Sequence, residues 1–189
     1  MKIGSGPKIC VGLSALLLVF SVALLPHMAW AATKMEINAS VDVALDRFAK
    51  HVKGGEDFLK AAKGMLVIPR IKQAGFIVGG KYGNGALRIG GRNVGYYNLA
   101  AASVGYQIGA QEFNILLCFM DKAALEKFRL SEGWQVGVDG EVTLVDIGAG
   151  GSVDTTKLNE PIVGFVFGQK GLMAGVSLEG LKFTKIHPK

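Results

Sequence analysis

Glycine is the residue that most constrains how this chain can fold. The segment from Gly75 to Gly180 contains 21 glycines in 106 residues, against a usual share of about 7%. Large apolar residues stand between these glycines, without a Pro-rich or Ser-rich bias, so the composition does not indicate disorder. Many glycines within strands fit the tight bends and close backbone approaches of a closed or nearly closed sheet.

Turn signals divide this glycine-rich segment into short apolar runs. They are Asn84-Gly85, Asp139-Gly140 and Gln169-Lys170-Gly171. Asn-Gly and Asp-Gly favour two-residue hairpin turns because both central positions need a positive φ. We therefore expect about eight to ten short antiparallel strands, with hairpins at these three places.

Apolar residues before residue 64 recur every three or four positions, which predicts a helix. The residues of this pattern are Met35, Val41, Leu45, Phe48 and Val52. Gly54-Gly55 should break the helix, and a second short helix should follow with Phe58, Leu59 and Ala62 on one side.

A third helix is predicted in "DKAALEKFRLSEG". Asp121 suits its N-cap, Gly133 its stop, and Leu125 and Phe128 its inward face. The predicted fold class is therefore α+β, with helices at 34–63 and 121–131 packed on a curved, Gly-rich antiparallel sheet or barrel.

The first 31 residues have the pattern of a secretory signal peptide. Lys2 and Lys8 precede an uncharged apolar run at 11–25, and "AWA" at 29–31 supplies small residues for cleavage after Ala31. An uncleaved anchor is the alternative, because no charge occurs between Ile9 and Lys34. We expect an exported protein, in the periplasm or at the outer-membrane periphery, with residues 32–189 as a single domain.

The chain after residue 31 is mildly basic. It has 19 basic and 15 acidic side chains, a net charge of +4 that is spread out and does not indicate a nucleic-acid partner. Its single cysteine, Cys118, excludes a disulfide within the chain and lies in the apolar run "FNILLCFM". A lone cysteine in such a run is typical of a small core residue.

The stretch "GFIVGGKY" at 75–82 comes close to a phosphate-binding loop but does not fit one. Tyr82 stands where a Mg²⁺-binding Ser or Thr is needed, and Phe76-Ile77-Val78 favours an extended strand over a compact loop. No nucleotide is expected. A similar stretch, "GFVFGQK", occurs at 164–170. The two stretches look like two hairpins, with Lys81 and Lys170 beside their turns.

Catalytic and metal-binding patterns are weak. Ser103 and Ser177 stand in near misses of G-x-S-x-G, and the two histidines after residue 31 are His51 and His187, neither with a nearby carboxylate pattern. The usual zinc and calcium spacings are absent from the sequence. We expect no metal and no cofactor.

Basic residues flank the apolar residues of the N-terminal helices. Lys53, Lys60 and Lys63 accompany Phe48, Val52 and Phe58, and Arg70 and Lys72 follow Pro69. A basic amphipathic helix of this kind can lie on an anionic lipid surface. The alternative is that the helix packs its apolar side on the sheet and keeps its lysines in water.

Five motifs occur in a fixed order between about Phe58 and Ile186. They read "AAKGMLVIP" (61–69), "AGFIVGGKYGNGAL" (74–87), "GYYNLAAASVGYQIGAQ" (95–111), "FMDKAALEKFRLSEGWQVGVD" (119–139) and "PIVGFVFGQKGLMAGVSLEG" (161–180). On these motifs the chain resembles the SYLF domain, a lipid-binding module of bacterial envelope proteins and of eukaryotic membrane-trafficking and actin-associated proteins.

The resemblance implies lipid or phosphoinositide binding without catalytic activity. In eukaryotic members, basic residues of the N-terminal amphipathic region are linked to head groups, and Lys53, Lys60 and Lys63 lie in the corresponding part of this chain. The actin binding of some eukaryotic members is not expected of an exported protein.

These observations predict an exported protein that binds anionic or apolar lipid at a membrane surface, with a role in envelope maintenance. Any protein partner is unknown. The candidate head-group contacts are Lys53, Lys60, Lys63, Arg70, Lys72, Lys81 and Lys170. Two alternatives stay open. One is a structural envelope protein or surface antigen that acts through protein contacts. The other is a hydrolase using Ser103 or Ser177 with His51 or His187.

Overall fold

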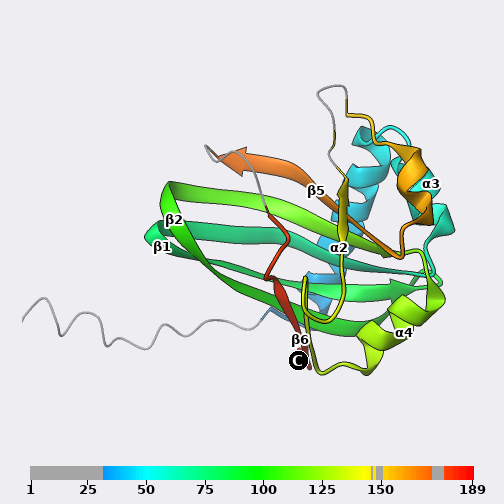
Figure 1. Cartoon of the computed structure of the whole chain (residues 1–189). Helices are drawn as coiled ribbons and strands as arrows, with labels where there is room; N and C mark the ends of the chain where they lie inside the picture. The colour runs from blue at the N-terminus through cyan, green and yellow to red at the C-terminus, as the bar shows by residue number, and fades with distance from the viewer. Residues whose placement is uncertain (1–31, 146, 148–150, 172–176) are drawn as a thin grey trace, which may run out of the picture. The chain divides into compact units, whose positions relative to one another are not determined.

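The structure is a computed structural model that describes residues 32–145, 147, 151–171 and 177–189 (Figure 1). The side chains of 75–78, 103–109 and 171 are not described. Residues 32–189 form one compact unit, and all that follows concerns this unit. The predicted signal peptide lies outside the described residues. Of the helices within the described part, none is long and apolar enough to cross a membrane.

Two helices precede the sheet, as the apolar pattern predicts. Helix α2 (Lys34–His51) begins with a capping box, in which the Thr33 hydroxyl accepts from the Glu36 N–H and the Glu36 carboxylate accepts from the Thr33 N–H. Gly54, in the left-handed conformation at φ 80°, separates α2 from α3 (Gly55–Ala61). The predicted break is therefore confirmed. Met35 is not on the apolar side as predicted, because 80% of its surface is exposed.

The third predicted helix is confirmed as α4 (Lys122–Leu130). The Asp121 side chain accepts from the Ala124 N–H at 2.8 Å, so Asp121 is the N-cap. Leu125 and Phe128 are buried. The helix ends before Gly133, which opens the next strand instead of stopping the helix.

Two long strands form the centre of the sheet. Strands β1 (Gly64–Ile89) and β2 (Arg92–Phe119) pair antiparallel along their lengths (Figure 1). The turn between them is Gly90-Gly91, where both residues have a positive φ. The predicted hairpin at Asn84-Gly85 is wrong. Strand β1 continues through it, because Asn84 pairs with Asn98 across the sheet and the two-glycine turn follows.

Four shorter strands complete the sheet of the described residues. They are β3 (Gly133–Gln135), β4 (Thr143–Val145), β5 (Ile162–Gly171) and β6 (Lys182–Ile186). The strand order is β3-β6-β2-β5-β4, and β1 pairs with β2 outside this order. A short 3-10 helix, η2 (Thr155–Asn159), precedes β5. The prediction of eight to ten short strands is therefore wrong for this part of the chain, because two long strands replace several short ones.

The predicted hairpin at Asp139-Gly140 is also wrong. Strand β3 pairs with β6, whereas β4 pairs with β5 in parallel, so the two flanking segments do not pair with each other as strands. The Asp139 carboxylate instead accepts from the Gln135 N–H at 2.8 Å and closes a local turn. Gln169, Lys170 and Gly171 form the end of β5, and the predicted partner of β5 begins at 172–176, outside the described residues.

Apolar side chains pack on both faces of the sheet. On one face, Phe113, Leu117 and Phe119 of β2 pack with Phe128 of α4 and with Trp134. The other face is covered by α2 and α3, whose apolar residues pack with Leu116, Cys118 and β5. Cys118 is a buried core residue as predicted, and its burial raises the pKa of the thiol. The predicted α+β fold with a curved sheet is confirmed, with one parallel strand pair in it.

The β1–β2 ribbon curls until two parts of β1 touch each other. A Cβ added to Gly85 would lie 1.8 Å from the carbonyl oxygen of Val67, and one added to Gly83 would lie 2.9 Å from side-chain atoms of Ile68 and Ile71. These glycines therefore let backbone approach backbone, which is the use that the composition predicts for strand glycines.

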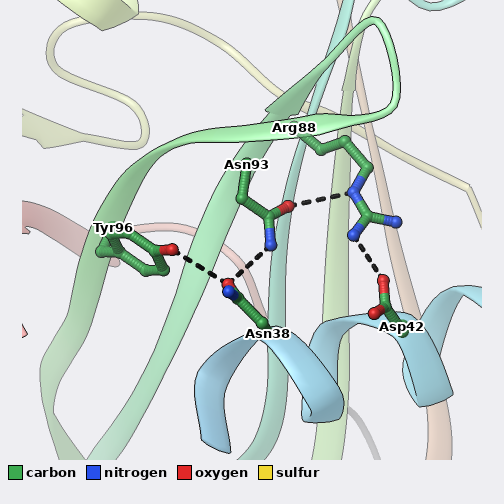
Figure 2. A network of polar contacts seen from close by, with 5 residues as sticks. All are labelled: Asn38, Asp42, Arg88, Asn93 and Tyr96. Atoms are coloured by element: carbon green, nitrogen blue, oxygen red, sulfur yellow. Dashed lines mark hydrogen bonds and ion pairs between the residues drawn. The ribbon is translucent and has the colours of Figure 1, made fainter. Parts of the chain in front are cut away.

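Side chains of α2 fasten this helix to the turn end of the ribbon (Figure 2). The Asn38 carbonyl oxygen accepts from the Asn93 amide at 2.8 Å and from the Tyr96 hydroxyl at 3.0 Å. Arg88 donates from Nε to Asn93 and forms an ion pair with Asp42, one turn further along α2. This network fixes the position of α2 against β1 and β2. It therefore determines which strand residues lie beneath the helix.

Replacing Gly85 by alanine should destabilise the fold strongly. The added Cβ meets backbone that cannot rotate away, and overpacking of this kind costs about 3 kcal/mol or more. Urea unfolding of residues 32–189 measures the loss. Gly80→Ala is the matched control, because its nearest atom would be at 3.7 Å, and it should change the free energy of unfolding by less than about 1 kcal/mol. Equal stability of the two variants would contradict the proposed close approach.

A basic pocket beneath helix α2

A pocket of about 250 Å³ lies between α2 and the strands β1, β2 and β5. Its lining includes three basic side chains, one from each of three elements: Arg47 from α2, Arg70 from β1 and Lys170 from β5. A single carboxylate, that of Glu112 on β2, lines it as well. The pocket therefore brings together basic residues that are far apart in the sequence.

Arg70 lines the pocket and lies at an irregularity in the backbone of β1. It is the one described non-glycine residue with a positive φ, 49°. The register between β1 and β2 shifts at this point, between Ile68 and Ile71. Its guanidinium donates to the Ser40 hydroxyl of α2 at 2.7 Å. A left-handed conformation costs a side-chain-bearing residue about 1–2 kcal/mol, and such strain is often found at functional sites.

Asn114 holds the irregular backbone in place from the floor of the pocket. Its side-chain oxygen accepts from the Arg70 N–H at 3.1 Å, and its amide donates to the Phe167 carbonyl at 3.0 Å. Only 5% of Asn114 is exposed, so these bonds satisfy a buried polar group while linking β1 to β5.

Gly168 gives the Asn114 amide and Arg47 the room they need. It has a φ of 64°, and a Cβ there would lie 2.6 Å from the Asn114 amide nitrogen. The same Cβ position is 3.6 Å from a guanidinium nitrogen of Arg47, so the Arg47 side chain passes over β5 at this glycine. Both the conformation and the close contacts require glycine here.

The basic groups of this pocket are not neutralised within the described part of the chain. There, the side chains of Arg47 and Lys170 form no ion pair or hydrogen bond, and that of Arg70 forms no ion pair. By contrast, Lys60 pairs with Glu56 at 2.8 Å on α3. Guanidinium groups are weakly hydrated and present forked donors, so two arginines and a lysine around one hollow are suited to a phosphate or carboxylate.

A larger hollow of about 520 Å³ is also lined by basic residues, but two of them have acidic partners. Arg129 pairs with Glu126 at 2.9 Å, and Lys185 pairs with Glu132 at 3.0 Å. These pairs reduce the positive charge available to a ligand. The pocket beneath α2 is therefore the better candidate for an anion.

The structure brings together some of the predicted site residues. Arg70 and Lys170 share the pocket, and Lys72 is aligned across the sheet with Glu112, which is aligned with Lys170. Lys53, Lys60 and Lys63 are exposed residues around α3, outside the pocket lining.

Lys81 is also outside the pocket. It is partly buried, and its amine donates to the Ser177 carbonyl at 3.0 Å. Burial lowers the pKa of this amine. Lys81 is thus engaged with the chain itself and less available to a ligand than the sequence suggests.

Sequence reasoning missed Arg47 and Asn114. Asn114 had a local signal, because it is the polar residue within the apolar run "FNILLCFM". Arg47 had none, since nothing in its helical neighbourhood distinguishes it from other exposed basic residues. Arg47 becomes part of the pocket only because α2 approaches Gly168 on β5 in the folded structure.

The apolar side of α2 and α3 packs on the sheet. Phe48 and Phe58 have no exposed surface, and both contact the Phe165 ring edge to face. The sequence left open whether these helices lie on a lipid surface or pack on the sheet. In the structure their apolar residues pack in the core. Contact with lipid through these side chains would require the helices to leave the sheet.

The described residues do not bring together the groups of the alternative serine hydrolase. Ser177 is exposed, and its hydroxyl accepts from the Glu179 N–H at 3.1 Å. His51 and His187 line two separate hollows, and neither described lining includes a serine. The Ser103 side chain lies outside the described part. Within the described residues no cluster of His, Cys, Asp or Glu is placed to hold a metal ion.

Replacing Arg70 by glycine should leave a more stable protein than replacing it by alanine. Both variants lose the bond to Ser40, but only glycine relieves the positive φ, which is worth about 1 kcal/mol. Urea unfolding of the two variants measures the difference. An alanine variant at least as stable as the glycine variant would show that the backbone at residue 70 is not strained.

Comparison with known proteins identifies one related family. The family model Ysc84, described as Las17-binding protein actin regulator, matches residues 100–187, which include most of β2, α4 and the strands β3 to β6. No curated protein matches the chain. The matched family is that of the SYLF domain, so this match supports the assignment of residues 100–187 to the SYLF domain family.

Proposed function

We propose that this protein is a non-enzymatic lipid-binding module that associates with the surface of anionic membranes. The basic pocket beneath α2 receives the negatively charged head group. One observation carries this proposal: Arg47, Arg70 and Lys170 converge on one hollow without an acidic partner at ion-pair distance among the described residues. The SYLF family is associated with lipid binding, which supports the same function.

A phosphate group suits the pocket chemically. Its oxygens accept forked bonds from guanidinium groups, and the lysine adds a point charge from the opposite side. Near an anionic surface each basic residue contributes about 1 kcal/mol, an effect that salt screens. Glu112 opposes the ligand, so the pocket favours a compact anion that approaches from the side of the arginines.

Export completes the proposed role. The N-terminal pattern of charge, apolar run and small residues supports a signal peptide that ends near Ala31. The protein then acts in the periplasm or at the outer-membrane periphery, in envelope maintenance. Both the location and this role are part of the proposal.

Protein contact is the less favoured function. The matching family is described as binding Las17 and regulating actin, but this describes the family and its named member. Large exposed apolar residues such as Leu130 and Val138 stand on different elements of the described chain. Single exposed apolar residues are ordinary on monomers.

Vesicle binding tests the pocket. Residues 32–189 should co-sediment with phosphatidylcholine vesicles that contain phosphatidylglycerol, and binding should decrease as salt rises. The double variant Arg47→Ala, Lys170→Ala removes two charges and should bind roughly 30-fold more weakly at low salt, at about 1 kcal/mol for each charge. Lys122→Ala, an exposed site on α4, is the control and should bind like the unmodified protein.

A second comparison separates the pocket from the lysines around α3. Charge reversal at Lys53, Lys60 and Lys63 tests the head-group contacts that the sequence predicts. If this variant loses binding and the double variant keeps it, the head group is bound near α3 and not in the pocket. If vesicles with and without phosphatidylglycerol are equally ignored, no head group is recognised.

A further inference from the structure

A second hollow, of about 330 Å³, lies on the other side of Arg47. Much of its lining is apolar, from Val52 at the C-cap of α2, Val166 and Phe167 of β5, and Ile147. Val52 and Phe167 are more than nine-tenths buried. No acidic residue is among its described lining, and His51 and Gln169 supply polar groups.

Arg47 is common to both hollows. Its side chain crosses β5 at Gly168, where the position of a Cβ would be 3.6 Å from a guanidinium nitrogen and 3.7 Å from the side-chain carbon Cδ. The basic pocket begins on one side of this crossing, with Lys170 and Asn114, and the apolar hollow on the other, with Phe167 and Val166. A cationic region and an apolar region thus adjoin at one arginine.

We propose that the two hollows form one bipartite site for an anionic amphiphile with a single alkyl chain. The phosphate or other acidic head lies among Arg47, Arg70 and Lys170, and the chain passes Arg47 into the apolar hollow. This proposal rests on the proposed function for its head-group half. It adds that the protein recognises the chain of an individual lipid and not only the charge of a membrane surface.

The size of the apolar hollow limits the ligand to one chain. At roughly 30 Å³ for each water-sized group, the hollow holds about ten or eleven chain atoms. This volume is at the lower end of small-molecule sites. Two acyl chains of a bilayer phospholipid do not fit together, so a single-chain lipid is the ligand class.

A homologous series of alkyl phosphates tests the site without a membrane. We would titrate methyl, butyl and octyl phosphate, each as a monomer, into residues 32–189 and follow the binding by calorimetry. These residues form one compact unit that contains both hydrophobic cores. Each methylene buried in the hollow should strengthen binding about fourfold, so octyl phosphate, with four more methylenes, should bind roughly 200-fold more tightly than butyl phosphate.

Substitution in the apolar hollow should remove the gain from the chain and leave the head group bound. Ile147→Asp places a charge in the path of the chain, because Ile147 lines the hollow and packs on the same face as Phe167, and it should make butyl and octyl phosphate bind about equally. Val138→Asp, an exposed position outside the lining, should keep the full dependence on chain length. Ile147→Thr replaces part of the apolar side chain by a hydroxyl, and it should give a reduced gain if Ile147→Asp does not fold.

The outcomes separate the two proposals. If methyl phosphate binds and lengthening the chain adds nothing, the bipartite site is wrong while the head-group pocket stands. If the gain from octyl phosphate persists in a folded Ile147→Asp variant, the chain binds elsewhere and the proposed chain path is overturned. If the Arg47→Ala, Lys170→Ala variant binds all three probes unchanged, the head-group pocket fails, and the bipartite site fails with it.

Discussion

The approach of Gly85 to the Val67 carbonyl is the contact on which the rest of the structure depends. Two strands as long as β1 and β2 would form a ribbon too extended to enclose a core unless the ribbon curled. A glycine at the crossing permits the curl, because any side chain there would collide with backbone. Once curled, the ribbon presents one face to α4 and the short strands and the other to α2 and α3.

The basic pocket is a consequence of the same geometry. Helix α2 lies across the face of the sheet that carries Leu116 and Cys118. The Asn38–Asn93 and Asp42–Arg88 contacts fix the first half of the helix there (Figure 2). Further along α2, Arg47 crosses β5 while the bulge at Arg70 points toward the helix. The strained backbone persists because Asn114 satisfies the freed N–H. A buried amide that links two strands is therefore what aligns the cations.

The sequence predicts local features well and the convergence of distant residues poorly. The caps at Thr33 and Asp121 and the break at Gly54 depend on a few neighbouring residues, and the related helices were predicted correctly. Asn84-Gly85 has the composition of a turn, but both residues pair with β2 across the sheet. The turn forms instead at Gly90-Gly91, where both residues have a positive φ. Arg70 and Lys170 were recognised as charges, whereas Arg47 becomes significant only through a tertiary contact.

Burial of the apolar side of α2 also decides how this protein can meet a lipid. Phe48 and Phe58 cover Phe165 of the sheet, so a helix that moved into the membrane interface would expose such sheet residues to water, at about 1.5–3 kcal/mol for each side chain. Binding through the polar surface of the folded domain avoids this loss. Helix α2 and the bulge place the two arginines around one hollow at the surface of the folded domain. For the proposed lipid-binding function, such a site favours contact with single head groups over insertion of a helix.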